Sequence, residues 1–219
     1  MGASNQVAGQ RPVVQLPSGR HELTREAVAA SQRQRLLDGV AEAVAAKGYA
    51  ATTIGDVVAA AAVSRRTFYE QFPDIESCFL AAYQSGMELL LSEIAPALRR
   101  HPEADWRARV RISLDAYLDA LSVRPAAAWA YSIEALGAGP AVLEHRAAVM
   151  GRWVEQWRGL LRLAREQGHS PPDISDEQLL LLVGGIEELV RECLRARGGQ
   201  HLPELAPPLS EIAISTLGG

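Results

Sequence analysis

Four side chains that can bind DNA lie close together at residues 65–69. Arg65, Arg66, Thr67 and Tyr69 belong to the segment SRRTFYEQF, which begins at Ser64. Arginine can bind guanine O6 and N7 through two hydrogen bonds, threonine can contact a thymine methyl group, and tyrosine can reach a phosphate. If the segment is helical, its N-terminus adds a partial positive charge that favours a phosphate. These residue types therefore predict a surface that reads the major groove of DNA.

Two short helices joined by a tight turn are expected to hold these side chains. Thr53 is placed to cap the first helix, and Ser64 is a good cap for the second. The apolar residues of the first helix fall at helical spacing: Ile54, Val57, Val58 and Ala61. The second helix has a buried side with Phe68 and Phe72 and a polar side with Arg66, Thr67 and Glu70. Many helical proteins contain such a pair with solvated arginines, so the pattern alone leaves both interpretations open.

The stretch TTIGDVVAAAAVSRRTFYEQF, residues 52–72, followed by PDIESCFLAAY, resembles the DNA-binding region of the tetracycline-repressor (TetR) family of transcriptional regulators. The similarity extends over about residues 33–83. It implies an all-α fold with an N-terminal three-helix DNA-binding domain and a C-terminal helical domain that dimerises and binds a small ligand. Ligand binding in this family lowers the affinity for the operator. The DNA-binding residues that follow from the resemblance are Thr53, Arg65, Arg66, Thr67 and Tyr69, to which we add Ser64 at the helix start.

Two positions depart from the pattern of the family. Ala62 stands in the turn where the family usually has glycine, and a left-handed backbone there would be strained by roughly 1 kcal/mol. Ile75 stands where a lysine is common and would contact a phosphate. We therefore expect one phosphate contact to be missing from each half-site.

The chain divides into three segments by composition and helical periodicity. Residues 1–22 are rich in Gly, Gln, Ser and Pro and are expected to form a disordered arm. Residues 23–74 would form the DNA-binding domain, and residues 75–219 a helical domain for effector binding and dimerisation.

Up to residue 75 there are eight basic and seven acidic residues, against 14 and 19 afterwards, so the mild charge asymmetry has the sign expected for DNA binding. Without a signal-peptide core or a run of 18 apolar residues, we expect a cytoplasmic protein with no membrane anchor.

Large side chains between residues 106 and 157, in the middle part of the chain, suit an apolar or aromatic effector. The candidate ligand-binding residues are Trp106, Tyr117, Trp129, Tyr131, Met150, Trp153 and Trp157. The alternative is that these residues form the hydrophobic core. His145 and Arg146 are possible polar anchors, although nothing in the sequence separates them from surface residues.

The C-terminal part is expected to form the dimer interface. An apolar helix beginning at Asp176 carries Gly184-Gly185 in its middle, with Glu187 and Arg191 paired on its outer side. A terminal helix is predicted to start at Pro207. These two helices and their symmetry mates would make a four-helix bundle. Such a homodimer could read a palindromic operator with recognition helices one DNA turn, about 34 Å, apart.

Two other classes of protein were weighed against a regulator. An enzyme would need a catalytic or cofactor motif, and we find no HExxH, GxSxG or phosphate-binding glycine loop, so no catalytic residue, metal site or cofactor is predicted. An all-helical ligand carrier that has lost DNA binding stays an alternative because of Ala62, Ile75 and Glu70. The sequence favours a ligand-responsive repressor that binds double-stranded operator DNA as a homodimer and is released by a small effector.

Overall fold

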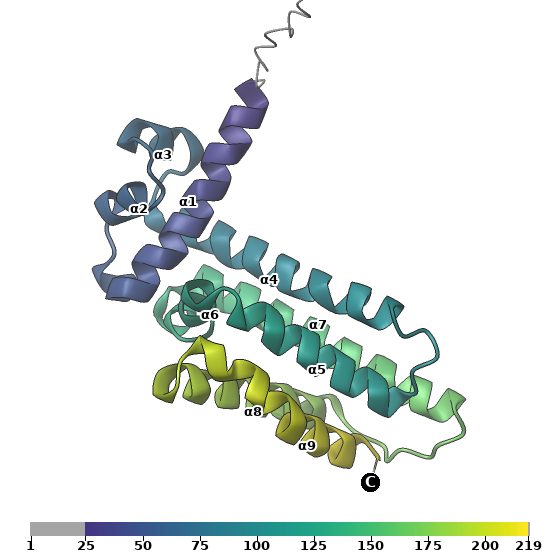
Figure 1. Cartoon of the computed structure of the whole chain (residues 1–219). Helices are drawn as coiled ribbons and strands as arrows, with labels where there is room; N and C mark the ends of the chain where they lie inside the picture. Colours follow the sequence, from purple (N-terminus) through teal and green to yellow (C-terminus); the bar gives the residue numbers. More distant parts are fainter. Residues whose placement is uncertain (1–24, 219) are drawn as a thin grey trace, which may run out of the picture.

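A computed structural model describes residues 25–218, and the predicted arm at residues 1–22 lies outside them. Within residues 25–218 the chain folds into α-helices and three short 3₁₀ helices, without a β-strand (Figure 1). The predicted all-α fold class is therefore confirmed. None of the helices in this part of the chain has the length and apolar content needed to cross a bilayer.

The N-terminal part contains three α-helices around a small core. They are α1 (Arg25–Lys47), α2 (Ile54–Ala60) and α3 (Arg65–Gln71), with the 3₁₀ helix η1 (Tyr49–Ala51) between α1 and α2. As expected, α1 ends at Lys47 and is followed by a glycine with positive φ, Gly48. The core is formed by fully buried side chains, among them Leu36, Val40, Val44, Val57 and Phe68.

Helices α1 and α2 approach each other at Gly39. A Cβ atom at this position would lie 2.8 Å from the backbone nitrogen of Ala61 and 2.9 Å from its Cβ atom. No larger residue fits without moving the two backbones apart. The glycine in the middle of α1 therefore costs some helix stability but allows α2, and with it α3, to lie directly on α1.

Helix α4 (Ile75–Arg99) joins the two parts of the molecule. Asp74 caps it, since its carboxylate accepts a hydrogen bond from the Ser77 amide at 2.7 Å. The first half of α4 contributes Phe79 to the N-terminal core, and the second half contributes Ile94 to the core of the C-terminal part. Figure 1 shows α4 leaving α1 to α3 and running along the top of the C-terminal helices.

The remaining helices surround a second, larger core. They are α5 (Trp106–Ser122), α6 (Pro125–Ser132), η2 (Glu134–Gly137), α7 (Pro140–Glu166), α8 (Asp176–Ala196), η3 (Gly199–Leu205) and α9 (Ala206–Gly218). Helices α8 and α9 lie together on the side farthest from α2 and α3 (Figure 1). The terminal helix begins one residue before the predicted Pro207, and the sequence did not indicate the 3₁₀ helix before it.

Candidate functional site

Two hydroxyl side chains fix the starts of α2 and α3. The Ser64 hydroxyl accepts a hydrogen bond from the Thr67 amide at 3.0 Å and lies 2.9 Å from the Thr67 hydroxyl. The Thr53 hydroxyl accepts from the Asp56 amide, while the Asp56 carboxylate accepts from the Thr53 amide, which completes a capping box. Both predicted caps are thus present, and they set the direction in which α3 leaves the turn.

Helix α3 buries one side and exposes the other. Phe68 is fully buried, whereas the Tyr69 residue is 57% exposed and the Arg66 side chain 89% exposed. The Arg66 Nε donates to the Glu70 carboxylate at 2.9 Å. Because an exposed ion pair of this kind contributes little free energy, the guanidinium group can exchange Glu70 for a phosphate or a base.

The six predicted DNA-binding residues all reach the surface of this unit. Five are exposed and Thr67 is half-buried; the exposed ones are Thr53, Ser64, Arg65, Arg66 and Tyr69. The Arg65 guanidinium lies over Gly55 of α2, since a Cβ atom at Gly55 would be 3.2 Å from its Nη2. The arrangement provides two arginines and a tyrosine along one exposed helix, as major-groove binding requires.

The turn between α2 and α3 keeps the left-handed backbone that glycine would favour. Ala62 has a φ of 51°. Its carbonyl accepts a hydrogen bond from the Arg35 guanidinium at 3.3 Å. Arg33 stacks over the Phe72 ring at 4.3 Å. Arg33 and Arg35 of α1 thus make contacts within the domain.

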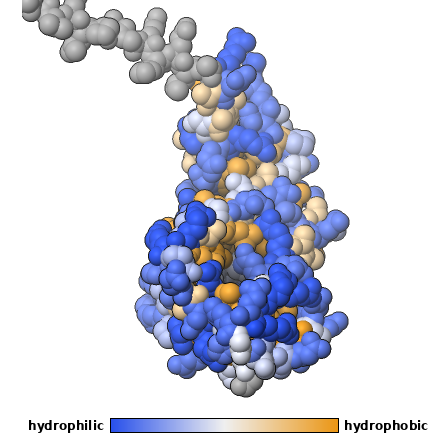
Figure 2. Space-filling view, turned by 90° about the vertical axis from the view of Figure 1, so that its right-hand side faces the viewer, coloured by the Kyte–Doolittle hydropathy of each residue, from blue (hydrophilic) through white to orange (hydrophobic). Residues whose placement is uncertain are grey.

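A cavity of about 290 Å³ lies between α4, α5, α7 and α8. Its walls are mainly apolar, with Leu91, Ile94, Leu114 and Leu160 among them. Figure 2 shows an apolar, hollowed area in the lower part of the molecule, bordered by hydrophilic residues. The cavity has the character of a site for a small apolar ligand.

Three of the seven predicted ligand-binding residues line this cavity, namely Tyr117, Trp153 and Trp157. The other four are not part of its walls. Trp106 is 1% exposed and packs against Gly218 of α9, and Met150 belongs to the C-terminal core. Trp129 and Tyr131 lie on α6, where Trp129 packs against the C-terminal core and Tyr131 against the N-terminal core. Sequence spacing could not separate these roles, because core and cavity side chains share the same helix faces.

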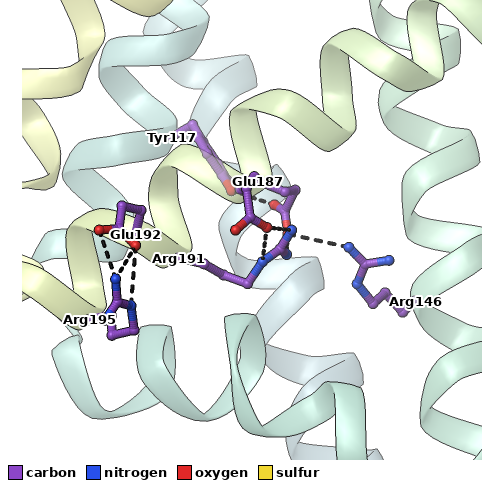
Figure 3. Close-up of polar contacts among 7 residues, drawn as sticks. Tyr117, Arg146, Glu187, Arg191, Glu192 and Arg195 are labelled. Carbon is purple, nitrogen blue, oxygen red and sulfur yellow. Dashed lines mark hydrogen bonds and ion pairs between the residues drawn. The ribbon is translucent and has the colours of Figure 1, made fainter.

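A polar cluster adjoins the cavity, and two of its members, Tyr117 and Glu187, belong to the cavity wall. The Tyr117 hydroxyl donates to the Glu187 carboxylate at 2.7 Å, and Arg191 and Arg146 lie 3.6 Å and 3.9 Å from the same carboxylate (Figure 3). The side chains of Glu187 and Arg191 are only 15% and 17% exposed. The prediction that this pair lies on the outer side of its helix was wrong. Glu187 follows Val183 by four residues, so it shares the inward face of α8.

Burial and the neighbouring carboxylate keep Tyr117 in its hydroxyl form. Desolvation, followed by the negative charge of Glu187 and the hydrogen bond to it, raises the pKa of Tyr117 well above its ordinary value of 10.0. Tyr117 therefore keeps its proton at physiological pH and donates a hydrogen bond to Glu187. No group of three or more His, Cys, Asp or Glu side chains within residues 25–218 is arranged to hold a metal ion.

Residues of α6 and η2 join the C-terminal part to the DNA-binding domain. The Tyr49 amide donates to the Glu134 carboxylate at 2.9 Å, and the Trp129 indole donates to the same group at 3.4 Å. The Tyr131 ring packs edge-on against Tyr83 of α4, with 5.6 Å between the ring centres. A Cβ atom at Gly86 of α4 would lie 2.4 Å from this ring. Trp129 and Tyr131 thus belong to the joint between the two parts.

Residues 36–82 match the family model described as bacterial regulatory proteins of the tetR family. The chain is 29% identical to the HTH-type transcriptional regulator EthR of Mycolicibacterium smegmatis over 193 residues, which cover 88% of this chain and 82% of that protein. Two solved structures share its fold. The fatty acid degradation regulator FadR of Bacillus halodurans has a TM-score of 0.73 at 17% identity, with 84% of this chain and 94% of that chain covered.

The second structure is the transcriptional regulator FadR of Bacillus subtilis in complex with stearoyl-CoA. Its TM-score is 0.72 at 14% identity, with 84% of this chain and 98% of that chain covered. The matched residues include α2, α3 and the caps that position them. Residues 36–82 thus match the DNA-binding region of tetR-family regulators, and the chain as a whole is similar to transcriptional regulators of that family.

Proposed function

We propose that this protein is a ligand-responsive repressor that binds a palindromic operator as a homodimer and is released by a small, largely apolar effector. The DNA-binding domain would comprise residues 23–74, and residues 75–219 would bind the effector and dimerise. The protein would act on the chromosome in the cytoplasm. The observation that carries the proposal is α3, which presents Arg65, Arg66 and Tyr69 to solvent above the buried Phe68.

Dimerisation is proposed to occur through α8 and α9. These helices expose large apolar side chains, with Leu181 75%, Leu180 48%, Leu189 42% and Ile212 49% exposed. Cβ atoms at Gly184 and Gly185 would meet no other atom within 4 Å, so the backbone of α8 is open to close contact there. A second copy would cover this surface, and the twofold symmetry would supply two α3 helices for the two operator half-sites.

Effector binding is proposed to act on DNA binding through α4. The cavity wall includes Leu91 and Ile94 of α4, and the same helix carries Phe79 of the N-terminal core. A ligand that shifts the second half of α4 would therefore move the DNA-binding domain relative to its dimer partner. Solved structure neighbours include a regulator bound to stearoyl-CoA. The cavity in this chain is suited to a smaller apolar molecule.

The proposal is tested by electrophoretic mobility shift with the full chain and the DNA upstream of its own coding sequence, across a salt series. Saturable, competitor-resistant binding that weakens with salt is expected. Arg66→Ala should weaken operator binding by about 1 to 3 kcal/mol and relax specificity, because it removes a candidate base contact. Arg162→Ala is the matched control, since Arg162 is an exposed arginine near the far end of α7.

Two results would contradict the proposal. Equal, weak binding to every duplex, upstream DNA and selected random sequences alike, would exclude a sequence-specific regulator and favour a helical ligand carrier. An unchanged affinity of Arg66→Ala would remove this residue from the reading surface even if the protein binds its operator. Arg162→Ala should bind the operator as the natural protein does.

A further inference from the structure

One wall of the effector cavity differs in chemistry from the rest. It is formed by Tyr117, Trp153 and Glu187, and the Tyr117 and Trp153 rings meet edge-on with 5.2 Å between their centres. Glu187 brings a carboxylate to a cavity that is otherwise mostly apolar. A half-buried carboxylate at such a place is expensive to desolvate and therefore suggests a functional role.

The Glu187 carboxylate has acceptor capacity that the protein does not use. A carboxylate offers about four lone-pair sites, and Glu187 accepts one hydrogen bond, from the Tyr117 hydroxyl at 2.7 Å. Arg191 and Arg146 approach it to 3.6 Å and 3.9 Å, which is beyond hydrogen-bonding distance. The positive charges of these arginines offset the negative charge of Glu187, but they leave lone pairs of its carboxylate free for another hydrogen-bond donor.

Arg109 and Arg191 donate hydrogen bonds to acceptors other than Glu187, and the buried Nη1 of Arg191 has no hydrogen-bond partner within residues 25–218. Arg191 donates from Nε and Nη2 to the Glu188 carboxylate at 2.9 Å and 2.7 Å. Arg109, which is part of the cavity wall, donates to the backbone carbonyls of Ala104 at 3.0 Å and Pro102 at 3.1 Å. An acidic ligand in the cavity would therefore find Arg109 of the wall already engaged by backbone carbonyls, and its own negative charge would face Glu187.

We propose that Glu187 anchors the effector, and that the effector is an apolar molecule with one hydrogen-bond donor, a hydroxyl or an amine, in preference to a carboxylic acid. This inference rests on the proposed role of the cavity as the effector site. The volume of about 290 Å³ is roughly twice that of an engineered cavity that accepts benzene, so the apolar body is small. Tyr117 would hold Glu187 in position, and Trp153 would pack against the ligand beside the donor.

Isothermal titration calorimetry of the full chain with three probes of one skeleton tests the inference. The probes are 4-phenylbutan-1-ol, 4-phenylbutan-1-amine and 4-phenylbutanoate. The alcohol and the amine should bind at least about tenfold more tightly than the carboxylate. Glu187→Gln removes the charge at nearly constant shape, and the ratio of amine to carboxylate affinity should fall about tenfold. Glu192→Gln is the matched control, because it also removes a carboxylate from an ion pair on α8 but pairs with Arg195 and has a side chain that is 53% exposed.

The outcomes separate this inference from the proposed function. Carboxylate binding as tight as that of the alcohol, or an affinity ratio that Glu187→Gln does not change, would overturn the donor preference while keeping the cavity as a ligand site. Binding of none of the three probes would count against the ligand site and the inference together, whereas operator binding is tested separately. The three probes can be compared on the natural chain alone. The donor preference can therefore be tested even if Glu187→Gln is unstable.

Discussion

The backbone amide of Tyr49 donates a hydrogen bond at 2.9 Å to the carboxylate of Glu134, 85 residues later in the chain. Tyr49 begins η1 just after α1, and Glu134 begins η2 just after α6. The bond therefore ties the DNA-binding domain to the C-terminal part at a place separate from the covalent link through α4. The covalent link and this hydrogen bond together restrict the orientation of the DNA-binding domain more than the covalent link alone would.

Replacing Glu134 by alanine should loosen this joint. The half-buried Tyr49 amide would lose its acceptor, and the unsatisfied donor is expected to destabilise the fold by about 1 to 3 kcal/mol. Chemical denaturation followed by circular dichroism measures this change. Glu144→Ala, at an exposed position of α7, is the control and should leave the midpoint unchanged. Equal stability of both variants would show that the bond contributes nothing.

Ala62→Gly should stabilise the protein. Ala62 is held at a φ of 51°, a conformation that costs a residue with a Cβ atom about 1 kcal/mol and glycine almost nothing. Thermal unfolding should therefore shift upward by about 2 to 4 °C. The control is Ala59→Gly inside α2, for which the same substitution should lower the melting temperature. A decrease for Ala62→Gly would mean that the turn has another conformation.

The contact between α1 and α2 should weaken at low pH through Asp56. The hydrogen bond from Lys47, at 2.5 Å, and those from Thr53 lower the pKa of Asp56 to about 2. A lowered pKa stabilises the folded state fully above the ordinary value of 3.8, and this contribution disappears as the pH falls toward 2. The stability difference between the natural chain and Asp56→Asn should thus be constant above about pH 4 and shrink below it. Urea denaturation at several pH values checks this, and a difference independent of pH down to 2 would contradict it.

Leu181→Glu should prevent self-association. Leu181 is 75% exposed on α8, where a second copy is proposed to cover it, and a charge there would have to be buried without a partner. Sedimentation velocity should show a monomer, and operator affinity should fall because only one half-site is bound at a time. Val123→Glu, at a residue 73% exposed at the end of α5, is the matched control and should remain dimeric. A dimeric Leu181→Glu variant would place the interface elsewhere.

The N-terminal domain could be predicted closely because its signals are local. The predicted caps at Thr53 and Ser64 act within one helical turn, and the structure has both of them. The left-handed conformation of Ala62 could also be anticipated, since the turn type demands it. These features depend on neighbours in sequence and hardly on tertiary packing.

The cavity was predicted less well because it depends on how distant helices meet. Trp153 and Trp157 line it, while Trp106, an aromatic residue of similar sequence character, is buried against α9. The inward position of Glu187 was missed because a charged pair four residues apart usually marks a solvated helix face. Glu187 lies four residues after Val183 and next to Ile186, and this position among buried residues was the signal in the sequence for its inward orientation. The role of Gly39 depends on a contact with Ala61 that periodicity alone does not reveal.

Helix α8 has two faces with different proposed roles. One carries Glu187 toward the cavity, and the other carries Leu181 and Gly185 toward the proposed second copy. A ligand that tilts α8 in one subunit would therefore alter the packing of the same helix in the other. The two cavities of a dimer would be thermodynamically linked, and the occupancy of one would change the affinity of the other by the same factor in both directions. Effector titrations of the dimer would then deviate from a simple hyperbola.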